Sequence, residues 1–512
     1  MLKADQGVYR LQVPGGTEAA IRALANNPNI AFVEPNYKVT TDAIASDTYY
    51  NSGALWGMES DDSPTSYGPS GTTNAFGSGA EEAWGLGYTG SRSVVVAVID
   101  EGIQITHPDL AANIWRNPGE VAGDGIDNDV NGYVDDVNGW DFYYDDNSVY
   151  DVGEDAHGTH VAGTIGALGN NGIGVAGVNW NVTIIPAKFL GPQGGYISDA
   201  VTALNYLTDL KTRYNINLVA VNNSWGGGGY SSAMHGAIIR AAKQDILFVA
   251  AAGNSTSNND ATASYPSNYS SLQGTATETA ASYESVIAVA SITSTGALSS
   301  FSSYGATTVD LGAPGSGIWS SVPTDSYASY NGTSMATPHV TGALALYSSY
   351  NTTAGASARR DAVLGNSIAT ASLAGRTVTG GRLSLEGLFG GSTEPPPPPP
   401  PPVVSTYDPT VVSVSAPATS RLNRNNTVFV TVGNLGNTAA QVRVALTASG
   451  GTPGNATTVL VPAGGTATAT INWKAPRVRT VYTLTATTTL VSTTLVDANL
   501  GNNTGSTTIT VV

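Results

Sequence analysis

The chain contains no cysteine, so neither disulfide bonds nor thiol chemistry can contribute to its stability or its function. Basic residues are also scarce: 21 Lys and Arg stand against 38 Asp and Glu, which gives a formal net charge of −17. That charge disfavours nucleic-acid binding. No apolar run reaches the roughly 18 residues that a membrane-spanning helix needs. The first residues also lack the pattern of a secretion signal.

The segment from Asn331 to Val340 carries the most information about chemistry. In it Gly332 precedes Thr333 and Ser334, and a run of small, helix-compatible residues follows. A serine on a glycine turn at the start of a helix has an exposed hydroxyl with backbone N–H donors beside it. Those are the surroundings that a nucleophile requires.

Three other segments carry groups that could assist such a serine. The run Val94–Ile99 is uninterrupted and apolar, as in a strand buried on both faces, and it ends at Asp100. Residues 157–164 carry two histidines among small residues. Residues 248–254 form a second buried-type strand that ends in an amide.

Together the four segments resemble the signatures of the subtilisin-like serine proteases, in that family's chain order of aspartate, histidine and serine. The resemblance implies that Ser334 is the nucleophile and His157 the general base. It also implies that Asp100 orients the imidazole and that Asn254 donates to the oxyanion. A hydroxyl needs such a base because it is a poor nucleophile, and an imidazole with a pKa near 6.5 can accept its proton near neutral pH.

The other histidines have less specific surroundings. In the family pattern His160 and His339 are structural neighbours of the site, and His107 and His235 are expected to be ordinary surface or packing residues. One departure is visible, because the family usually has a small residue after the catalytic aspartate and this chain has Glu101. Its carboxylate could raise the pKa of the catalytic histidine. It could also favour basic substrate residues, or simply point to solvent.

Four regions are expected along the chain. Residues 47–388 alternate buried-type strands with helical segments, which predicts an α/β fold with a mostly parallel sheet and helices on both faces. The resemblance implies the three-layer subtilisin-like arrangement. Residues 1–44 resemble the C-terminal half of the subtilase propeptide, a small α+β unit that inhibits the enzyme and assists its folding. An unrelated extension is the alternative.

The propeptide resemblance has two consequences. The missing first half suggests that the sequence is truncated and that a secretion signal lay upstream, so the enzyme is expected to be secreted. The mature enzyme would begin near residues 40–47 after self-cleavage.

Residues 389–402 end in eight consecutive prolines. They predict a polyproline spacer of about 25 Å, with an SH3-type ligand as the alternative. Residues 403–512 alternate Thr and Val with glycine turns, which predicts an all-β sandwich. This region is similar to the cell-adhesion-related β-sandwich domains, which implies binding of a surface or polymer ligand, or spacing.

Two calcium sites are expected. The first is a loop with the oxygen spacing of an EF-hand but without its final glutamate, and a solvated acidic loop is the alternative. Its ligands would be Asp127, Asp129, Asn131, Tyr133 and Asp135. The second site follows from the subtilase resemblance alone. Its ligands would be Asp47, Asp109, Leu168, Asn171, Ile173 and Val175.

The resemblance also places the substrate cleft. Protein and peptide substrates would pair with the glycine-rich segment after residue 223, and side-chain-free walls would leave room for a large apolar or aromatic residue. The residues implied are Ser224, Trp225, Gly226, Ala251, Ala252 and Gly253. Trp225 replaces an aliphatic residue, so it either narrows adjacent pockets or packs in the core.

The sequence therefore predicts a secreted, calcium-stabilised serine endopeptidase. The rival hypothesis is a binding or adhesion protein on a degenerate protease scaffold. It is disfavoured because a scaffold has no need of an intact triad and oxyanion donor. Sedolisin-type acid proteases are disfavoured by the histidine segment.

Overall fold

The computed structural model describes residues 45–59, 75–389, 407–436, 439–449, 453–462, 464–491, 497 and 499–512, with short stretches before residue 45. Most of the predicted propeptide remnant and residues 390–402 of the predicted linker lie outside these residues. Contacts divide the chain into two compact units, Met1–Ala43 and Ile44–Val512. In the first unit, β1 (Leu2–Lys3) pairs antiparallel with β2 (Tyr9–Arg10).

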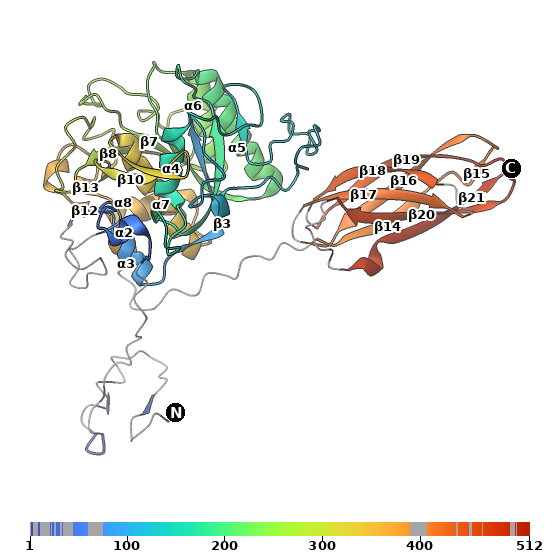
Figure 1. Cartoon of the computed structure of the whole chain (residues 1–512), viewed down its shortest axis with the longest axis horizontal. Coiled ribbons are helices and arrows are strands. Elements are labelled where there is room, and N and C mark those ends of the chain that lie inside the picture. The colour runs from blue at the N-terminus through green and yellow to red at the C-terminus, as the bar shows by residue number, and fades with distance from the viewer. Residues whose placement is uncertain are drawn as a thin grey trace. The chain divides into compact units, whose positions relative to one another are not determined.

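The second unit is built around a large, mostly parallel sheet, seen in Figure 1. Within the described residues every neighbouring pair of its strands is parallel except β12 with β13. From one edge to the other the strands are β12 (Ile368–Ala369), β13 (Gly381–Arg382), β9 (Leu311–Pro314), β8 (Val286–Ile292), β7 (Leu247–Ala251), β6 (Asn217–Asn223), β3 (Gly90–Asp100), β5 (Asn181–Lys188) and β4 (Trp140–Asp141).

Helices cover both faces of this sheet, because its central strands are apolar on both sides. In β3, Val95, Ala97 and Ile99 face a core formed with α5 and α6, which lie side by side in Figure 1. The alternate residues of β3 point to the opposite face, where α7 packs on the central strands and α4 packs on α7. The three-layer α/β fold predicted from the sequence is thus confirmed.

The helices of this part, and one hairpin beside the sheet, have the following bounds. They are α2 (Thr48–Asn51), α3 (Ala80–Gly85), α4 (Ala156–Gly166), α5 (Ile197–Tyr214), α6 (Ser232–Lys243), α7 (Thr333–Tyr350), α8 (Ala356–Gly365), α9 (Leu385–Phe389), the short 3₁₀ turns Ala111–Asn113 and Ala371–Leu373, and the strands β10 (Ile318–Val322) and β11 (Ser326–Tyr330).

The C-terminal region is all-β in its described residues, as the Thr and Val alternation predicts. One sheet has the order β14–β16–β19 and the other β15–β21–β20–β17–β18. In β16 the valines 428, 430 and 432 are buried while the residues between them face outward, because side chains alternate along a strand. The elements are β14 (Pro409–Ser415), β15 (Thr419–Ser420), β16 (Asn425–Asn434), β17 (Ala440–Ala448), β18 (Pro453–Val461), β19 (Thr466–Lys474), β20 (Val481–Leu490), the 3₁₀ turn Leu500–Asn502 and β21 (Thr504–Val511).

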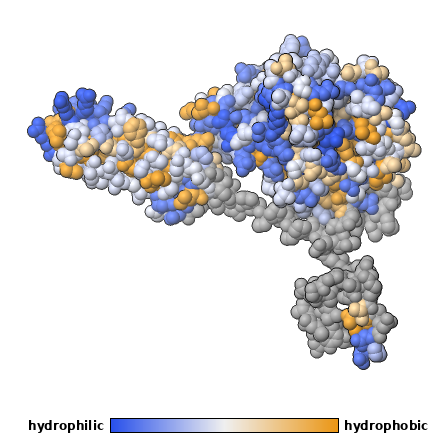
Figure 2. All heavy atoms as spheres, turned by 180° about the vertical axis from the view of Figure 1, so that it is seen from behind, coloured by the Kyte–Doolittle hydropathy of each residue, from blue (hydrophilic) through white to orange (hydrophobic). Residues whose placement is uncertain are grey.

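The surface of the described parts is mixed in polarity. On the face shown in Figure 2, hydrophobic side chains are scattered among hydrophilic ones. None of the described helices has both the length and the apolar character that crossing a membrane would require.

Candidate active site

The predicted aspartate and histidine meet where β3 ends and α4 begins. Asp100 is the last residue of β3 and His157 the second of α4, and their Oδ1 and Nδ1 atoms lie 2.8 Å apart. The Asp100 side chain is 1% exposed and that of His157 30% exposed. Burial by itself lowers the pKa of His157, but the Asp100 and Glu101 carboxylates outweigh it and hold this pKa above its usual value.

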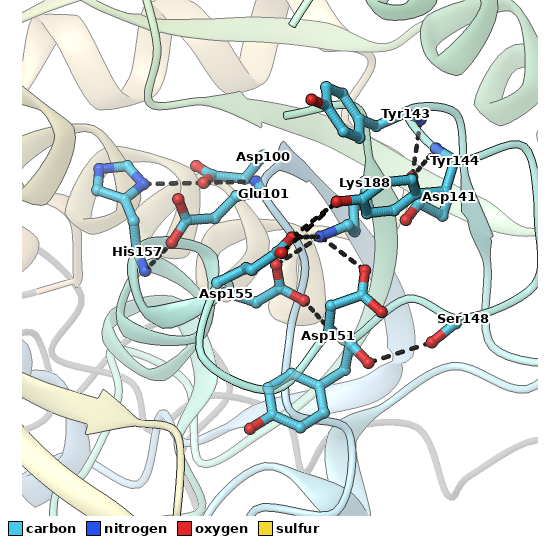
Figure 3. Close-up of polar contacts among 12 residues, drawn as sticks. Asp100, Glu101, Asp141, Tyr143, Tyr144, Ser148, Asp151, Asp155, His157 and Lys188 are labelled. Atoms are coloured by element: carbon cyan, nitrogen blue, oxygen red, sulfur yellow. Dashed lines mark hydrogen bonds and ion pairs between the residues drawn. The ribbon is translucent and has the colours of Figure 1, made fainter. Parts of the chain in front are cut away.

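Glu101 does not point to solvent. Its Oε1 accepts a hydrogen bond from the main-chain N–H of His157, as Figure 3 shows. Burial raises the pKa of Glu101, and the neighbouring Asp100 carboxylate raises it further. The residue that departs from the family pattern is therefore in direct contact with the predicted base.

Near this pair lies a buried ammonium group among carboxylates, which we call the lysine-centred cluster: Lys188 with Asp151, Glu154 and Asp155. Figure 3 shows Lys188 with Asp151 and Asp155. The Lys188 Nζ lies 2.6 Å from Asp155, 3.1 Å from Asp151 and 3.9 Å from Glu154, and its side chain is fully buried. Burial lowers the pKa of Lys188, but the carboxylates reverse that effect and keep it charged. Lys188 ends β5 and pairs in register with Asp100.

The predicted nucleophile begins a long helix. Ser334 is the second residue of α7, and its hydroxyl donates to the Ser224 carbonyl at 3.0 Å. In return the Ser224 hydroxyl donates to the Ser334 carbonyl at 2.8 Å. These reciprocal bonds hold the end of β6 against the start of α7.

Asn254 lies just after β7, and its side-chain orientation is fixed by Thr333. The Oδ1 atom accepts hydrogen bonds from the Thr333 N–H and hydroxyl, each at 2.9 Å. The Nδ2 group is therefore directed away from Thr333. A Cβ built on Gly332 would lie 3.5 Å from this Nδ2 and 3.5 Å from the Ser334 backbone nitrogen. The two nitrogens therefore lie close together beside the serine.

The remaining histidines are packing residues, as expected. His160 Nε2 lies 2.9 Å from the Ile318 carbonyl and His339 Nδ1 lies 2.9 Å from the Met335 carbonyl. Burial lowers the pKa of His160 to about 3 and that of His339 to about 4, so both rings are neutral. The side chains of residues 107 and 235 are buried against tyrosine rings.

The predicted cleft residues line two strand ends. Ala251 ends β7, and Gly253 (φ +109°) has the Ser303 and Ser264 hydroxyls within 3.5 Å of where a side chain would begin. A Cβ on Gly226 would lie 3.4 Å from the Tyr265 carbonyl. Any side chain at either glycine would therefore contact these neighbouring atoms.

Two other predicted cleft residues are less accessible. The ring of Trp225 packs edge-on against Phe189 with centroids 4.9 Å apart, which is the packing alternative for this residue. Ala252 is fully buried.

Comparison with known proteins decides the family. The model of the subtilase family matches residues 91–390. The chain belongs to the subtilase family. A thermophilic serine proteinase of Bacillus sp. (strain AK1) is 34% identical over 336 residues, which cover 65% of this chain and 67% of the relative. An extracellular protease of Xanthomonas campestris pv. campestris is 36% identical over 370 residues, covering 69% of this chain and 57% of that protein.

A solved structure agrees with this assignment. A protease from Pseudoalteromonas arctica PAMC 21717 aligns with a TM-score of 0.51 at 25% identity, covering 68% of this chain and 99% of that one. The subtilase described here is accordingly a serine endopeptidase.

The predicted second calcium site of this subtilase contains two buried carboxylates. Asp47 and Asp109 are both fully buried, and Asp47 accepts the Asn170 N–H at 2.7 Å. Burial raises the pKa of Asp47 to about 6, with Asp109 adding to the shift. Asp109 accepts the Asn171 amide at 2.7 Å and the Val175 N–H at 3.0 Å.

The other predicted ligands of that site lie on the same loop. The Leu168 N–H donates to the Asp109 carbonyl at 2.8 Å, and the Ile173 N–H donates to Asn171 Oδ1 at 3.0 Å. The loop thus wraps around Asp109. The two buried carboxylates thus lie beside this loop, and each accepts hydrogen bonds from it.

The predicted EF-hand-like loop is only partly assembled as expected. Asp127 and Asp129 lie together with Glu120, which the sequence did not point to, and we call these three residues the loop cluster. Asp135 instead accepts the N–H groups of Gly123 and Gly125 at 2.8 and 2.9 Å.

The two other predicted ligands in that loop contact neighbouring side chains. The Asn131 amide donates to Asp129 and Asp136 at 3.2 and 2.9 Å. The Tyr133 ring packs on Trp140 and Tyr206.

Within the loop cluster, Glu120 has one carboxylate oxygen that accepts hydrogen bonds and one that does not. Its Oε1 accepts the Asn128 and Asp129 N–H groups at 2.9 and 3.2 Å. Its Oε2 is buried and has no hydrogen-bond partner among the described residues. Burial raises the pKa of Glu120 to about 8, and the nearby Asp136 and Asp129 carboxylates raise it too. A buried carboxylate oxygen without a donor fits a cation ligand.

Proposed function

We propose that this subtilase hydrolyses peptide bonds with Ser334 as nucleophile, His157 as general base, Asp100 as the group that orients the imidazole, and Asn254 as oxyanion donor. The observations that carry the proposal are the 2.8 Å contact between Asp100 and His157 and the position of two nitrogens, Asn254 Nδ2 and Ser334 N, close together beside the serine. Such a pair can stabilise the oxyanion of a tetrahedral intermediate.

The reaction would follow the order that these contacts allow. The Ser334 hydroxyl leaves the Ser224 carbonyl, gives its proton to His157 and attacks the substrate carbonyl. The carboxylate of Asp100, 2.8 Å from Nδ1, stabilises the imidazolium that forms. The imidazolium then protonates the leaving amine, and water releases the acyl group by the same steps in reverse roles.

The substrates proposed are proteins held in extended form along Ser224 to Gly226. Gly226 and Gly253 carry no side chains at the cleft wall, so we expect cleavage after aromatic or long aliphatic residues. Because one of its relatives is named an extracellular protease, we expect this enzyme to act outside the cell.

The test is hydrolysis of casein, with and without a serine-reactive fluorophosphonate. A Ser334→Ala variant should lose activity by several orders of magnitude, because the nucleophile is absent. Full activity in that variant would reject the mechanism. A wild-type protein that neither cleaves casein nor reacts with the reagent would instead favour the binding-protein alternative.

We further propose calcium at both acidic sites. Glu120, Asp127 and Asp129 would hold one ion, and Asp47, Asp109 and the loop 168–175 the other. When bound, calcium supplies positive charge to buried carboxylates and ties distant segments together. The chain's own residues do the rest, since each carboxylate is already oriented by main-chain donors.

We also propose roles for the two flanking regions. Residues 1–44 would inhibit the enzyme until self-cleavage near residues 40–47. The C-terminal β-sandwich would bind a surface or polymer, connected through the proline-rich segment. Mass spectrometry of the N-terminus of active and Ser334→Ala protein tests the first role, since only the active protein should be processed.

A further inference from the structure

The N-terminus of α4, the helix that carries His157, is capped by a side chain that does not belong to the helix. An aspartate at the N-cap of a helix ordinarily accepts an N–H of the first turn with its own side chain. Asp155 is at this position in α4 and makes no such bond. Its carboxylate accepts the Lys188 ammonium at 2.6 Å and the Asp151 N–H instead. A first-turn N–H, that of His157, is bound by Glu101.

The last residue of β3 and the first residue after it therefore both bind His157. Asp100 binds the imidazole ring of His157, and the next residue, Glu101, binds its main-chain N–H. The turn that follows β3 passes close to Asp155 at Gly102, which has φ +120° and where a Cβ would lie 2.6 Å from Asp155 Oδ2. Figure 3 shows both carboxylates directed to His157, with the lysine-centred cluster beside them.

We propose that Glu101 is a positioning residue for the catalytic histidine: its carboxylate caps α4 on the N–H of His157, in place of Asp155, which Lys188 holds. The capping hydrogen bond is thus made to the main chain of the proposed general base itself. A helix N-terminus carries partial positive charge, so an anionic cap is favoured there. The inference rests on the catalytic role proposed for His157.

The negative charge of Glu101 has a second effect on the same residue. The charged groups that face Glu101 are Asp100 from β3 and His157 and Asp155 from the start of α4. The lysine-centred cluster adds the ammonium of Lys188 behind Asp155. In its ionised form Glu101 favours the imidazolium, which forms when the serine is deprotonated.

Two substitutions separate the hydrogen bond from the charge. Glu101→Gln keeps an oxygen that can accept the N–H but removes the charge, whereas Glu101→Ala removes both. Asp361→Asn is the matched control, since it removes one exposed negative charge on α8. For each purified, processed protein, kcat and KM are measured for a chromogenic peptide across pH 5–10, together with the melting temperature.

We expect Glu101→Ala to lose roughly tenfold in kcat with KM little changed, since a charge-assisted hydrogen bond to the base-bearing helix is lost. Glu101→Gln should recover most of that kcat. Both variants should show the acidic limb of kcat/KM displaced to lower pH, because a negative charge beside the imidazolium is gone. Asp361→Asn should leave kcat and the limb where they are in the wild type.

The contrary results are equally clear. Wild-type kcat together with an unmoved acidic limb in Glu101→Ala would overturn the proposal. So would a loss of kcat in Glu101→Gln as large as in Glu101→Ala, since the acceptor would then be irrelevant. Failure of the catalytic assignment itself would appear elsewhere, as retained activity in Ser334→Ala or His157→Ala. If Glu101→Ala does not fold, the limb and kcat of Glu101→Gln decide the matter.

Discussion

The lysine-centred cluster and the loop cluster each bring three carboxylates within ligand distance, yet they differ in how their charge is balanced. In the first, the fully buried ammonium of Lys188 lies among the acids. In the second, Glu120 has a buried oxygen with no donor in the described residues. Acidic residues alone therefore do not define a metal site. In the second cluster the Arg213 guanidinium donates to the main-chain carbonyl of Asp129, at 2.9 Å. The ammonium that contacts the carboxylates themselves is that of Lys188 in the first cluster, so we expect the second cluster to need an external cation.

The largest effect is expected from removing the Lys188 ammonium. Lys188→Met leaves the buried Asp155 carboxylate without its ammonium and should lower the free energy of unfolding by about 3–5 kcal/mol. Denaturant unfolding in a Ser334→Ala background, where the protein cannot digest itself, measures this. Lys243→Met is the control: its ammonium lies 3.2 Å from Glu278 at the surface, and its loss should cost about 1 kcal/mol or less. Equal losses of unfolding free energy in the two variants would show that the buried ion pairs of Lys188 stabilise the fold no more than a surface pair does.

The loop cluster should respond to calcium instead. Excess chelator should lower the melting temperature of the wild type, because an ion at 100 times its Kd stabilises by about 2.7 kcal/mol. Glu120→Gln should show a smaller calcium-dependent shift, since one charged ligand is lost.

The matched control for Glu120→Gln lies in the other cluster. Glu154→Gln, beside Lys188, should keep the full wild-type shift. A calcium response unchanged by Glu120→Gln, or lost in Glu154→Gln, would reverse the roles assigned to the two clusters.

The histidines extend the comparison to pH. His160 and His339 are buried, and among the described residues no carboxylate contributes to their pKa values, which burial lowers to about 3 and about 4. Below the unfolded value near 6.5, the unfolded chain binds protons that the folded protein does not. Stability should therefore fall as pH drops from about 6.5 towards 4, by roughly 1.4 kcal/mol per pH unit for each ring.

His157 should act in the opposite sense, because its pKa is raised and its imidazolium is favoured in the fold. The check is the slope of unfolding free energy against pH in wild type and His339→Asn. A shallower slope is expected in the variant. An identical slope would mean that His339 does not titrate on unfolding.

The smallest effect is expected at the exposed edge of the lysine-centred cluster. The side chain of Asp151 is 31% exposed, and Lys188 keeps Asp155 at 2.6 Å without it. Asp151→Asn should cost about 1 kcal/mol or less in the same unfolding assay. A loss as large as that of Lys188→Met would show that the cluster acts as one unit.

Local patterns predicted the fold well, and they also supplied the catalytic candidates. The run Val94–Ile99 is apolar enough to define a central strand, and β3 covers it. The helical segments expected to alternate with the strands include α5 and α6. The short motifs around His157 and Ser334 also fix which turn each residue occupies. These features depend on neighbours in sequence, which is why the sequence reveals them.

Contacts between distant residues were not predictable in the same way. Lys188 lies 33 residues after Asp155, and only its place as the first basic residue after Arg116 hinted at its role. Glu120 precedes the recognisable loop and carries no motif of its own. Glu101 can cap α4 because Lys188 binds Asp155. This arrangement involves three segments that are distant in sequence, those of Glu101, Asp155 and Lys188.

The most direct test of the catalytic account is to locate a fluorophosphonate adduct by mass spectrometry. The account predicts one label per molecule, on Ser334, with labelling greatly slowed in His157→Ala because the hydroxyl then lacks its base. A label on another residue, or equally fast labelling of Ser334 without the histidine, would contradict it.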